Sequence, residues 1–145
     1  MTTAVATVIG AIVRALKTAP YVSNNVFRAR LRPLPTDWPT AVVVRPRGSV
    51  KDNPDIGSNT FGIWDTAIEV ECYAHGSADP DLVVDPLLQA VANRLLADRT
   101  LGGTVGGLDI AVIGYDFDAT ADTAACATIT LTIRHATAAN SLAAL

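Results

Sequence analysis

The chain has 145 residues, half of them hydrophobic, and its 14 acidic residues outnumber its 11 basic residues, giving a net charge of −3. This length and composition predict one domain with a single core, and they exclude the basic patches by which nucleic-acid-binding proteins hold phosphates. Gly10, Arg14 and Lys17 interrupt the N-terminal apolar stretch, so neither a signal peptide nor a membrane-spanning helix is predicted, and we expect a soluble, cytosolic protein.

The N-terminal residues predict a helix. Its apolar residues recur at helical spacing, Thr2 or Thr3 can cap its start, and Pro20 follows its end. The apolar positions are Val5, Val8, Ile9, Ile12, Val13 and Leu16.

A first strand is predicted from residue 26 until Pro33. Arg28, Arg30 and Arg32 share one parity and alternate with apolar residues, so the strand has one basic face. The arginines could contact phosphates or a partner's carboxylates. They could equally protect an edge strand from edge-to-edge association, and both interpretations stay open.

A second strand, residues 40–46, is a nearly continuous apolar run, and we expect Trp38 to anchor its entrance in the core. Residues 47–60 are rich in Gly, Asn, Asp, Ser and Pro and predict a flexible loop, longer than a hairpin turn needs. Such a loop either orders against a neighbouring subunit or remains an idle connection.

A long strand is predicted over residues 61–75, where apolar and polar residues alternate. Glu69 and Glu71 share one face, about 7 Å apart by strand geometry. Two carboxylates at that separation can act as a glycosidase pair, but a solvated sheet face is the favoured interpretation because no pocket signal accompanies them.

The chain's cysteines and histidines predict no metal site. Cys72, Cys126, His75 and His135 include no close pair, and Cys72 points away from His75 along its strand. Cys72 and Cys126 are expected on opposite faces of the sheet, so no disulfide is predicted. His135 follows an apolar alternation and is expected to be packed or at the rim rather than to act as a base.

The second helix has two possible starts. Asp79 with Pro80 and Asp85 with Pro86 each match an N-cap followed by proline. We expect a preliminary turn at the first pair, the continuous helix from the second, and its end at the glycines at 102–103. Asp85 is then a cap rather than a catalytic acid.

Two strands complete the domain, over residues 108–119 and 125–137, and a loosely held tail follows at about 137–145. Strict alternation would separate Leu108, Ile110 and Val112 from Ile113, Tyr115 and Phe117. In the last strand the threonine and arginine side would meet the glutamate side of residues 61–75, and Arg134 could offset Glu69 or Glu71.

The order of elements predicts an α+β fold, a two-layer sandwich in which a mostly antiparallel sheet carries two helices on one face. The other face is polar and must meet solvent, a lumen or a partner. Motifs for a serine nucleophile, a zinc protease or a phosphate-binding loop are missing, and the glycines of residues 100–109 lack the lysine of a phosphate loop. No catalysis, cofactor or metal is predicted.

The pattern of parts resembles the tail terminator proteins of long-tailed bacteriophages, the minor tail protein U-like family. The resemblance covers nearly the whole chain, residues 1–145. It rests on the helix ending in ALKTAP, the PTAVVVRPRGSVKDNPDIGSN hairpin, the strand TAIEVECYAHG, the DPLLQAVANRLLAD helix and the final DIAVIGYDFDATADTAACATITLTIRH pair.

This resemblance implies a structural virion protein without catalysis. It implies a homohexameric ring at the head-proximal end of the tail, assembled in the bacterial cytoplasm, which caps the tail tube, ends its polymerisation and docks the head-side connector. Glu69 and Glu71 become candidate lumen residues, past which DNA slides without specific binding. The candidate subunit or tube interface comprises Arg28, Arg30, Arg32, Arg47, Lys51 and Asp52.

Two alternatives remain open at this point. A head-tail connector or completion adaptor has the same size and assembly logic but acts at the head. A small enzyme using Glu69, Glu71 or Asp116 would require a deep pocket.

Overall fold

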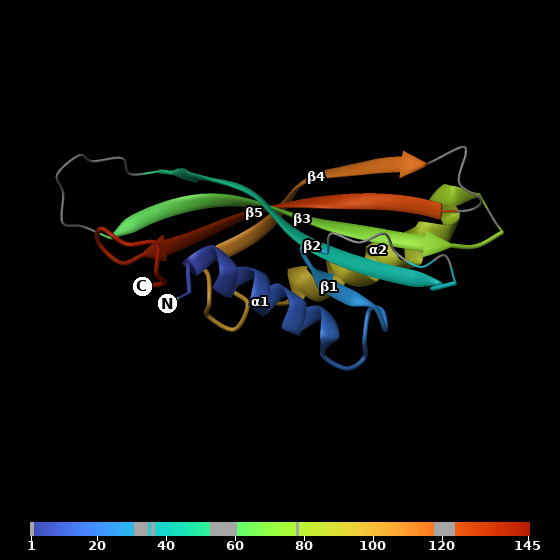
Figure 1. The fold of residues 1–145 in the computed structure, drawn as a ribbon, viewed down its shortest axis with the longest axis horizontal. Helices are drawn as coiled ribbons and strands as arrows, with labels where there is room; N and C mark the ends of the chain where they lie inside the picture. The colour runs from blue at the N-terminus through green and yellow to red at the C-terminus, as the bar shows by residue number, and fades with distance from the viewer. Residues whose placement is uncertain (1, 31–34, 36, 53–60, 78, 118–123) are drawn as a thin grey trace.

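The computed structural model describes residues 2–30, 35, 37–52, 61–77, 79–117 and 124–145. Its elements are α1 (Ala4–Lys17), β1 (Val26–Arg28), β2 (Thr40–Lys51), β3 (Gly62–His75), α2 (Pro80–Ala97), β4 (Gly107–Phe117) and β5 (Ala124–Thr137). The strands form one sheet in the order β1-β2-β3-β5-β4 (Figure 1). Neighbouring strands are antiparallel except for the parallel β1–β2 pair, so the predicted α+β fold is confirmed.

The start of α1 agrees with the sequence prediction. Thr3 is the N-cap, and its Oγ1 accepts a hydrogen bond from the backbone N of Ala6 at 3.2 Å. Val8, Ile12 and Leu16 are buried against the sheet because they recur on one side of the helix. This cap and this apolar stripe fix where α1 begins and which side it turns to the sheet.

The start of α2 differs from the prediction. The helix runs without a break from Pro80, with Pro86 inside it, and Asp85 is an exposed helical residue rather than its cap. Proline interrupts one backbone hydrogen bond, to the carbonyl four residues earlier. That residue is Leu82, in the first turn of the helix, and it is 61% exposed.

The end of α2 also comes earlier than the glycine pair suggested. The helix stops at Ala97, and the side chain of Asp98 accepts hydrogen bonds from the backbone N of Gly102 at 2.7 Å and of Thr100 at 3.2 Å. These bonds hold the pKa of Asp98 below its usual value. Gly102 and Gly103 have positive φ and shape the turn after the helix.

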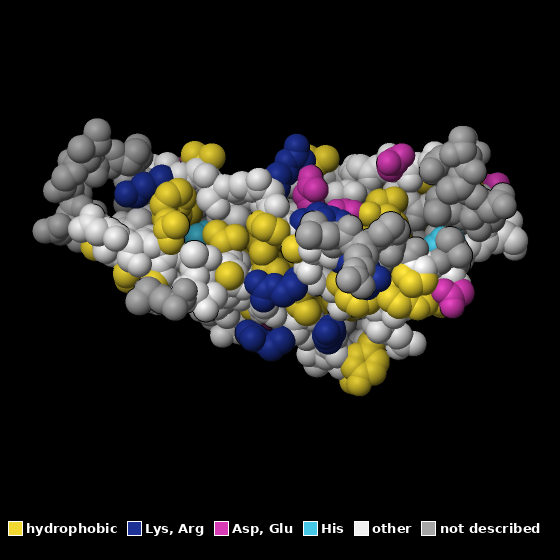
Figure 2. Space-filling view, viewed as in Figure 1, with side chains coloured by type: hydrophobic (Ala, Val, Ile, Leu, Met, Phe, Trp, Pro, Cys, Tyr) yellow, Lys and Arg dark blue, Asp and Glu magenta, His cyan; other side chains and the backbone are white. Residues whose placement is uncertain are grey.

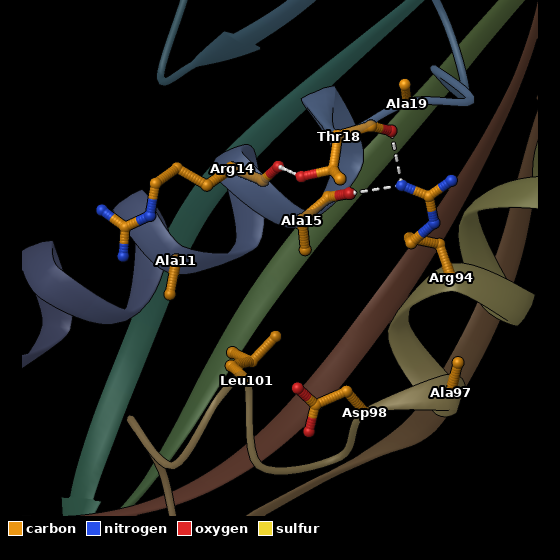
Figure 3. A pocket seen from close by; sticks show the side chains of 9 residues that line it. All are labelled: Ala11, Arg14, Ala15, Thr18, Ala19, Arg94, Ala97, Asp98 and Leu101. Atoms are coloured by element: carbon orange, nitrogen blue, oxygen red, sulfur yellow. Dashed lines mark hydrogen bonds between the residues drawn. The ribbon is translucent and has the colours of Figure 1, made fainter.

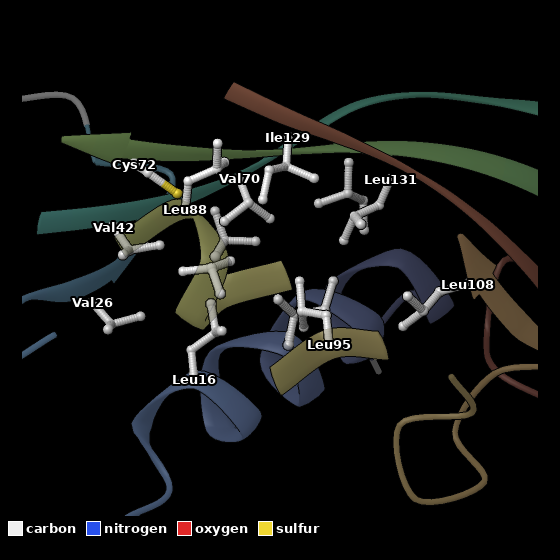
Figure 4. Packing of buried hydrophobic residues seen from close by; sticks show 14 of the residues in the cluster. Leu16, Val26, Val42, Val70, Cys72, Leu88, Leu95, Leu108, Ile129 and Leu131 are labelled. Carbon is white, nitrogen blue, oxygen red and sulfur yellow. The ribbon is translucent and has the colours of Figure 1, made fainter. Parts of the chain in front are cut away.

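The core lies between the helices and one face of the sheet, here named the helix face (Figure 4). The alternation predicted for β3 and β5 is confirmed, because every second residue is buried from Thr66 to Ala74 in β3 and from Ala125 to Thr137 in β5. The labelled side chains of Figure 4 come from all five strands and both helices: Leu16, Val26, Val42, Val70, Cys72, Leu88, Leu95, Leu108, Ile129 and Leu131.

The first strand is shorter than predicted and has no basic face. β1 ends at Arg28 because Ala29 adopts a positive φ of 45°, which breaks the alternation. Arg28 lies on the helix side, where its Nη2 donates to the carbonyl of Ala6 at 3.0 Å. Arg30 lies over the ring of Phe27, and Arg32 is outside the described residues.

Trp38 was expected to pack in the core, but it does not enter the core between the helices and the sheet. Its ring stacks on Phe27, with centroids 5.4 Å apart and planes 15° from parallel. Phe27 is the neighbour of the buried, helix-facing Val26 along β1, so alternation turns it to the opposite face. The two rings therefore cover the helix-free side of the β1 edge.

β4 contains a bulge that overturns its strict alternation. The register with β5 shifts between Ile110 and Val112, so Ile110 pairs with Leu131 and Ile113 pairs with Ile129. Directly paired residues share a face, and both β5 partners point to the helices. Beyond the bulge Ile113, Tyr115 and Phe117 thus lie on the same face as Leu108 and Ile110.

The predicted loop after β2 begins later than residue 47. β2 continues to Lys51, which pairs with Trp64, and the backbone N of Asp52 donates to the carbonyl of Ile63 at 2.8 Å. Residues 53–60 lie outside the described residues. The first part of the segment expected to be flexible is therefore one arm of a long hairpin.

The C-terminal tail is tied down rather than loosely held. The carbonyl of Leu142 accepts a hydrogen bond from the backbone N of Ala4 at 2.7 Å, and the backbone N of Leu145 donates to Ala136 at 3.4 Å. Isolated bridges join Thr3 to Ala143 and Thr137 to Ala144. The tail thus connects the start of α1 to the end of β5.

Candidate functional site

The helix-free face of β2, β3 and β5, named here the open face, gathers the polar side chains of the sheet. Its residues are Arg45, Arg47, Asp65, Ala67, Glu69, Glu71, Tyr73, Cys126, Thr128, Thr130, Thr132 and Arg134. Basic and acidic side chains lie against one another on the molecular surface (Figure 2). Because β3 pairs with β5, the predicted meeting of the glutamate and threonine sides is confirmed.

Glu71 is the most enclosed carboxylate of the open face. Its side chain is 14% exposed and forms an ion pair with Arg45, while the hydroxyl of Tyr73 donates to its other oxygen. Burial and the hydrogen bond to Glu71 raise the pKa of Tyr73, so this hydroxyl stays a donor at neutral pH. Both carboxylate oxygens of Glu71 are therefore engaged within the chain.

Glu69 has a separate partner. Nη1 of Arg47 lies 2.6 Å from Oε1 of Glu69, and this pair is more exposed than the Arg45–Glu71 pair. On the β5 side Glu69 stands opposite Thr130, and Glu71 stands opposite Thr128. The middle of the open face is thus polar, with each acid matched by a base.

Arg134 does not offset either glutamate, contrary to the expectation from pairing. It forms ion pairs with Asp52 and, at 3.4 Å, with Asp65. The register explains this, since Arg134 stands opposite Asp65 on β3, four residues before Glu69. The β2–β3 hairpin brings Asp52 to the same place, and these two contacts raise the pKa of Arg134.

The arrangement of Glu69 and Glu71 does not resemble a glycosidase pair. Each carboxylate forms an ion pair with a different arginine. Neither glutamate lines a cavity among those found in the described residues. A glycosidase needs two free carboxyl groups facing one another across a substrate. The open face can instead present a broad polar surface with little net charge.

The cysteines and histidines lie apart, as the sequence predicted for the two thiols. Cys72 is buried on the helix face and Cys126 lies on the open face, 3.9 Å from the hydroxyl of Thr128. Burial raises the pKa of Cys72 to about 12 and also raises the pKa of Cys126. His75 contacts the carbonyl of Trp38 through Nδ1 at 2.9 Å.

Metal-binding side chains do not converge in the part of the chain that the structure describes: no group of three or more His, Cys, Asp or Glu residues there could hold a metal ion. Within the same residues, no helix is both long and apolar enough to cross a membrane.

A cavity of about 500 Å³ lies between α1, α2 and the turn that follows α2 (Figure 3). Arg94 of α2 reaches across it and donates to the carbonyls of Ala15 at 2.8 Å, Thr18 at 2.7 Å and Pro20 at 2.5 Å. These carbonyls belong to the end of α1 and the chain after it, where a cation is favourable. Arg94 is thus engaged in holding the two helices together.

A second cavity, of about 250 Å³, lies between the sheet, the start of α1 and the C-terminal tail. His135 lines it and is 6% exposed, in agreement with its prediction as a packed histidine. Its Nε2 lies 2.6 Å from the hydroxyl of Thr66, which also contacts Ser49 at 2.7 Å. Burial lowers the pKa of His135, which favours the neutral ring.

The edge strand β4 carries the most exposed group of large apolar side chains in the sheet. Val112, Ile113, Tyr115 and Phe117 are 58%, 43%, 55% and 41% exposed. Sequence reasoning missed this group because the bulge and the position of β4 at the edge, beyond the cover of the helices, are tertiary features. Exposed apolar clusters of this kind mark association surfaces.

Comparison with known proteins gives one line of evidence, from structure. A chain from the virion of a native gene transfer agent (GTA) particle is similar over 87% of this chain and 92% of its own length, with a TM-score of 0.52 and 14% sequence identity. At this identity the likeness shows a shared fold. No family model and no curated protein matches the sequence.

Proposed function

We propose that the protein is a structural virion component that forms a homohexameric ring, caps the tail tube of a phage-like particle and presents the surface on which the head-side connector docks. The observation that carries this proposal is the shared fold with a chain of an assembled virion particle, over nearly the full length of both chains. The resemblance of the pattern of elements to tail terminator proteins supports the more specific role of a tube cap.

We also propose that DNA passes through this ring along the open face. A channel wall must let a polyanion slide, so it should neither carry strong positive charge nor bind bases. The ion pairs of Glu69 and Glu71 with Arg47 and Arg45 leave the middle of this face polar and balanced rather than acidic. The balanced charge of these ion pairs would then let DNA slide past Glu69 and Glu71 without specific binding.

The β2–β3 hairpin is the proposed contact to the tube or the neighbouring subunit. Lys51 is exposed at the end of its β2 arm, and the exposed Asp52 follows it and is paired with Arg134. Arg47, a candidate for this contact from the sequence, is paired with Glu69, and we assign it to the open face instead. Many weak contacts of this kind, repeated around a ring, add up to firm attachment.

Labelling tests the assigned position. Gold particles bound to a C-terminal tag on the full chain should mark the head-proximal end of the tail, on headless tails as well as on complete particles. Label that is found only on heads would favour the alternative, a head-tail completion adaptor, over the tube cap.

A pair of matched variants tests the open face as a channel wall. Replacing Glu69 and Glu71 together by lysine reverses two charges per subunit and should lower the yield of infectious or DNA-delivering particles. The exchange Arg47→Glu with Glu69→Arg keeps both the ion pair and the net charge, so its yield should equal that of the wild type. Equal yields from all three proteins would remove the open face from the channel while leaving the cap intact.

A further inference from the structure

The two edges of the sheet differ in chemistry. β4 forms one edge and β1 the other, and in the described part of the chain each pairs with a single strand. An edge strand exposes unpaired backbone N–H and C=O groups and is a natural site for association unless it is protected.

The second half of β4 lacks the usual protection. After its bulge it contains neither proline nor a basic residue, and it exposes the apolar group Val112, Ile113, Tyr115 and Phe117. The ring centroids of Tyr115 and Phe117 lie 5.7 Å apart. Asp116, the residue between them in the sequence, is exposed. The β4 edge, defined as residues 112–117, is therefore apolar and acidic.

The opposite edge is aromatic and basic. The stacked rings of Phe27 and Trp38 lie beneath the guanidinium group of Arg30, at 4.6 Å and 5.3 Å from the two ring centres. Arg28, on the same short strand, is exposed. The β1 edge, defined as Phe27, Arg28, Arg30 and Trp38, thus complements the β4 edge in charge.

We propose that the β4 edge of one copy of this chain docks on the β1 edge of a second copy. In a continuous sheet, Asp116 of one copy and Arg30 of the next lie together on the helix-free side, beside the Phe27–Trp38 stack. Tyr115 and Phe117 lie on the helix side and pack against the side chain of Arg28. Because the two surfaces lie on opposite edges of one sheet, the contact is head-to-tail, and its repetition closes a ring when the rotation fits. This inference rests on the proposed function, which supplies the ring.

The exposed arm of β2 is a poorer partner for β4. Beyond the residues that pair with β1, it contains Pro46, which has no backbone N–H, and a register shift between Pro46 and Gly48. Both features block the addition of a regular strand. The β1 edge is the better match because it offers side chains of opposite charge to Asp116.

Two single variants and their mixture test the contact by sedimentation velocity. Asp116→Arg reverses the β4 edge, and Arg30→Asp reverses the β1 edge. Each should shift the wild-type oligomer to monomer, because every contact in a ring of one variant sets like charges together. An equimolar mixture should reassemble, since alternation of the two variants puts opposite charges at every contact. Asp85→Arg, the same charge change on exposed α2, is the control and should assemble like the wild type.

The outcomes separate the two proposals. A wild-type ring with both variants still assembled would overturn the docking contact and leave the proposed function standing. Monomeric variants that do not reassemble on mixing, although circular dichroism shows them folded, would also overturn it. A wild type that stays monomeric at every concentration would contradict the contact, and the lengths of tail tubes would then decide the proposed function separately.

Discussion

Arg47 places Nη1 2.6 Å from Oε1 of Glu69 across the β2–β3 hairpin, next to the more enclosed pair of Arg45 and Glu71. The side chain of Arg47 is 64% exposed and that of Arg45 is 34% exposed, so water screens the Arg47–Glu69 pair more than the Arg45–Glu71 pair. We predict that Arg47→Ala lowers the free energy of unfolding by about 0.2–1 kcal/mol. Arg45→Ala should cost about 1–3 kcal/mol, because it leaves Glu71 short of a partner in a less exposed site.

Urea denaturation of the two variants measures this difference. Equal losses of stability would contradict the ranking by exposure.

Arg94 joins α2 to the end of α1 through three carbonyl oxygens. Lysine keeps the charge but lacks the planar fork that reaches several acceptors at once. We predict that Arg94→Lys lowers the free energy of unfolding by about 1–3 kcal/mol. Arg14→Lys, at an exposed position on the same cavity, should stay within about 0.5 kcal/mol of the wild type. Thermal unfolding of both proteins makes the comparison, and matching midpoints would show that the three contacts do not stabilise the helix pair.

Gly62 lies where a larger residue has no room. A Cβ there would come within 2.7 Å of Oγ1 of Thr137 and 2.8 Å of Nε1 of Trp64, two atoms that hydrogen-bond to one another at 3.0 Å. We predict that Gly62→Ala breaks this bond and costs about 1–3 kcal/mol of stability. Gly114→Ala on β4 is the control, since its Cβ would meet nothing within 4 Å. A loss no larger for Gly62→Ala than for the control would refute the steric argument.

His135 gives the fold a pH dependence. Its burial holds its pKa below the ordinary value of 6.5, while the negative charge of Asp65 partly opposes the shift. The folded state therefore disfavours the proton, and stability is lost as the pH falls below about 6.5, where the unfolded chain begins to bind it. Between about pH 7 and pH 5, the free energy of unfolding should fall less steeply for His135→Gln than for the wild type.

Thr66→Val serves as the comparison for this measurement because it removes the hydroxyl that contacts His135 and keeps the titrating ring. This variant should have a lower free energy of unfolding than the wild type, but its free energy should depend on pH in the same way. Identical slopes for the wild type and His135→Gln would contradict the assignment to His135.

Much of the fold could be predicted because local patterns carry it. The stripe of Val8, Ile12 and Leu16 marks the buried side of α1, and the alternation around Ile68 and Ile129 marks two strands that each have one buried face. The predictions that were wrong depended on single backbone angles or on the register between strands. The positive φ of Ala29 and the bulge after Ile110 have no signal in the hydrophobic period.

The candidate site was predictable only in part. Alternation placed Glu69 and Glu71 on the helix-free face, but their partners depend on the register of the β2–β3 hairpin, which the sequence does not specify through a long connection. Arg45 was therefore missed, and Arg134 was given the wrong partners. The exposed half of β4 could not be foreseen because edge position follows from strand order.

The length of tail tubes tests the tube-capping claim most directly. Tails from cells that lack a functional copy of this chain should be measured by electron microscopy beside tails from cells that carry one. The proposed cap predicts tubes that grow beyond the normal length, with a broad distribution and no attached heads. Tubes of normal, uniform length in its absence would contradict the proposal that this protein ends tube polymerisation.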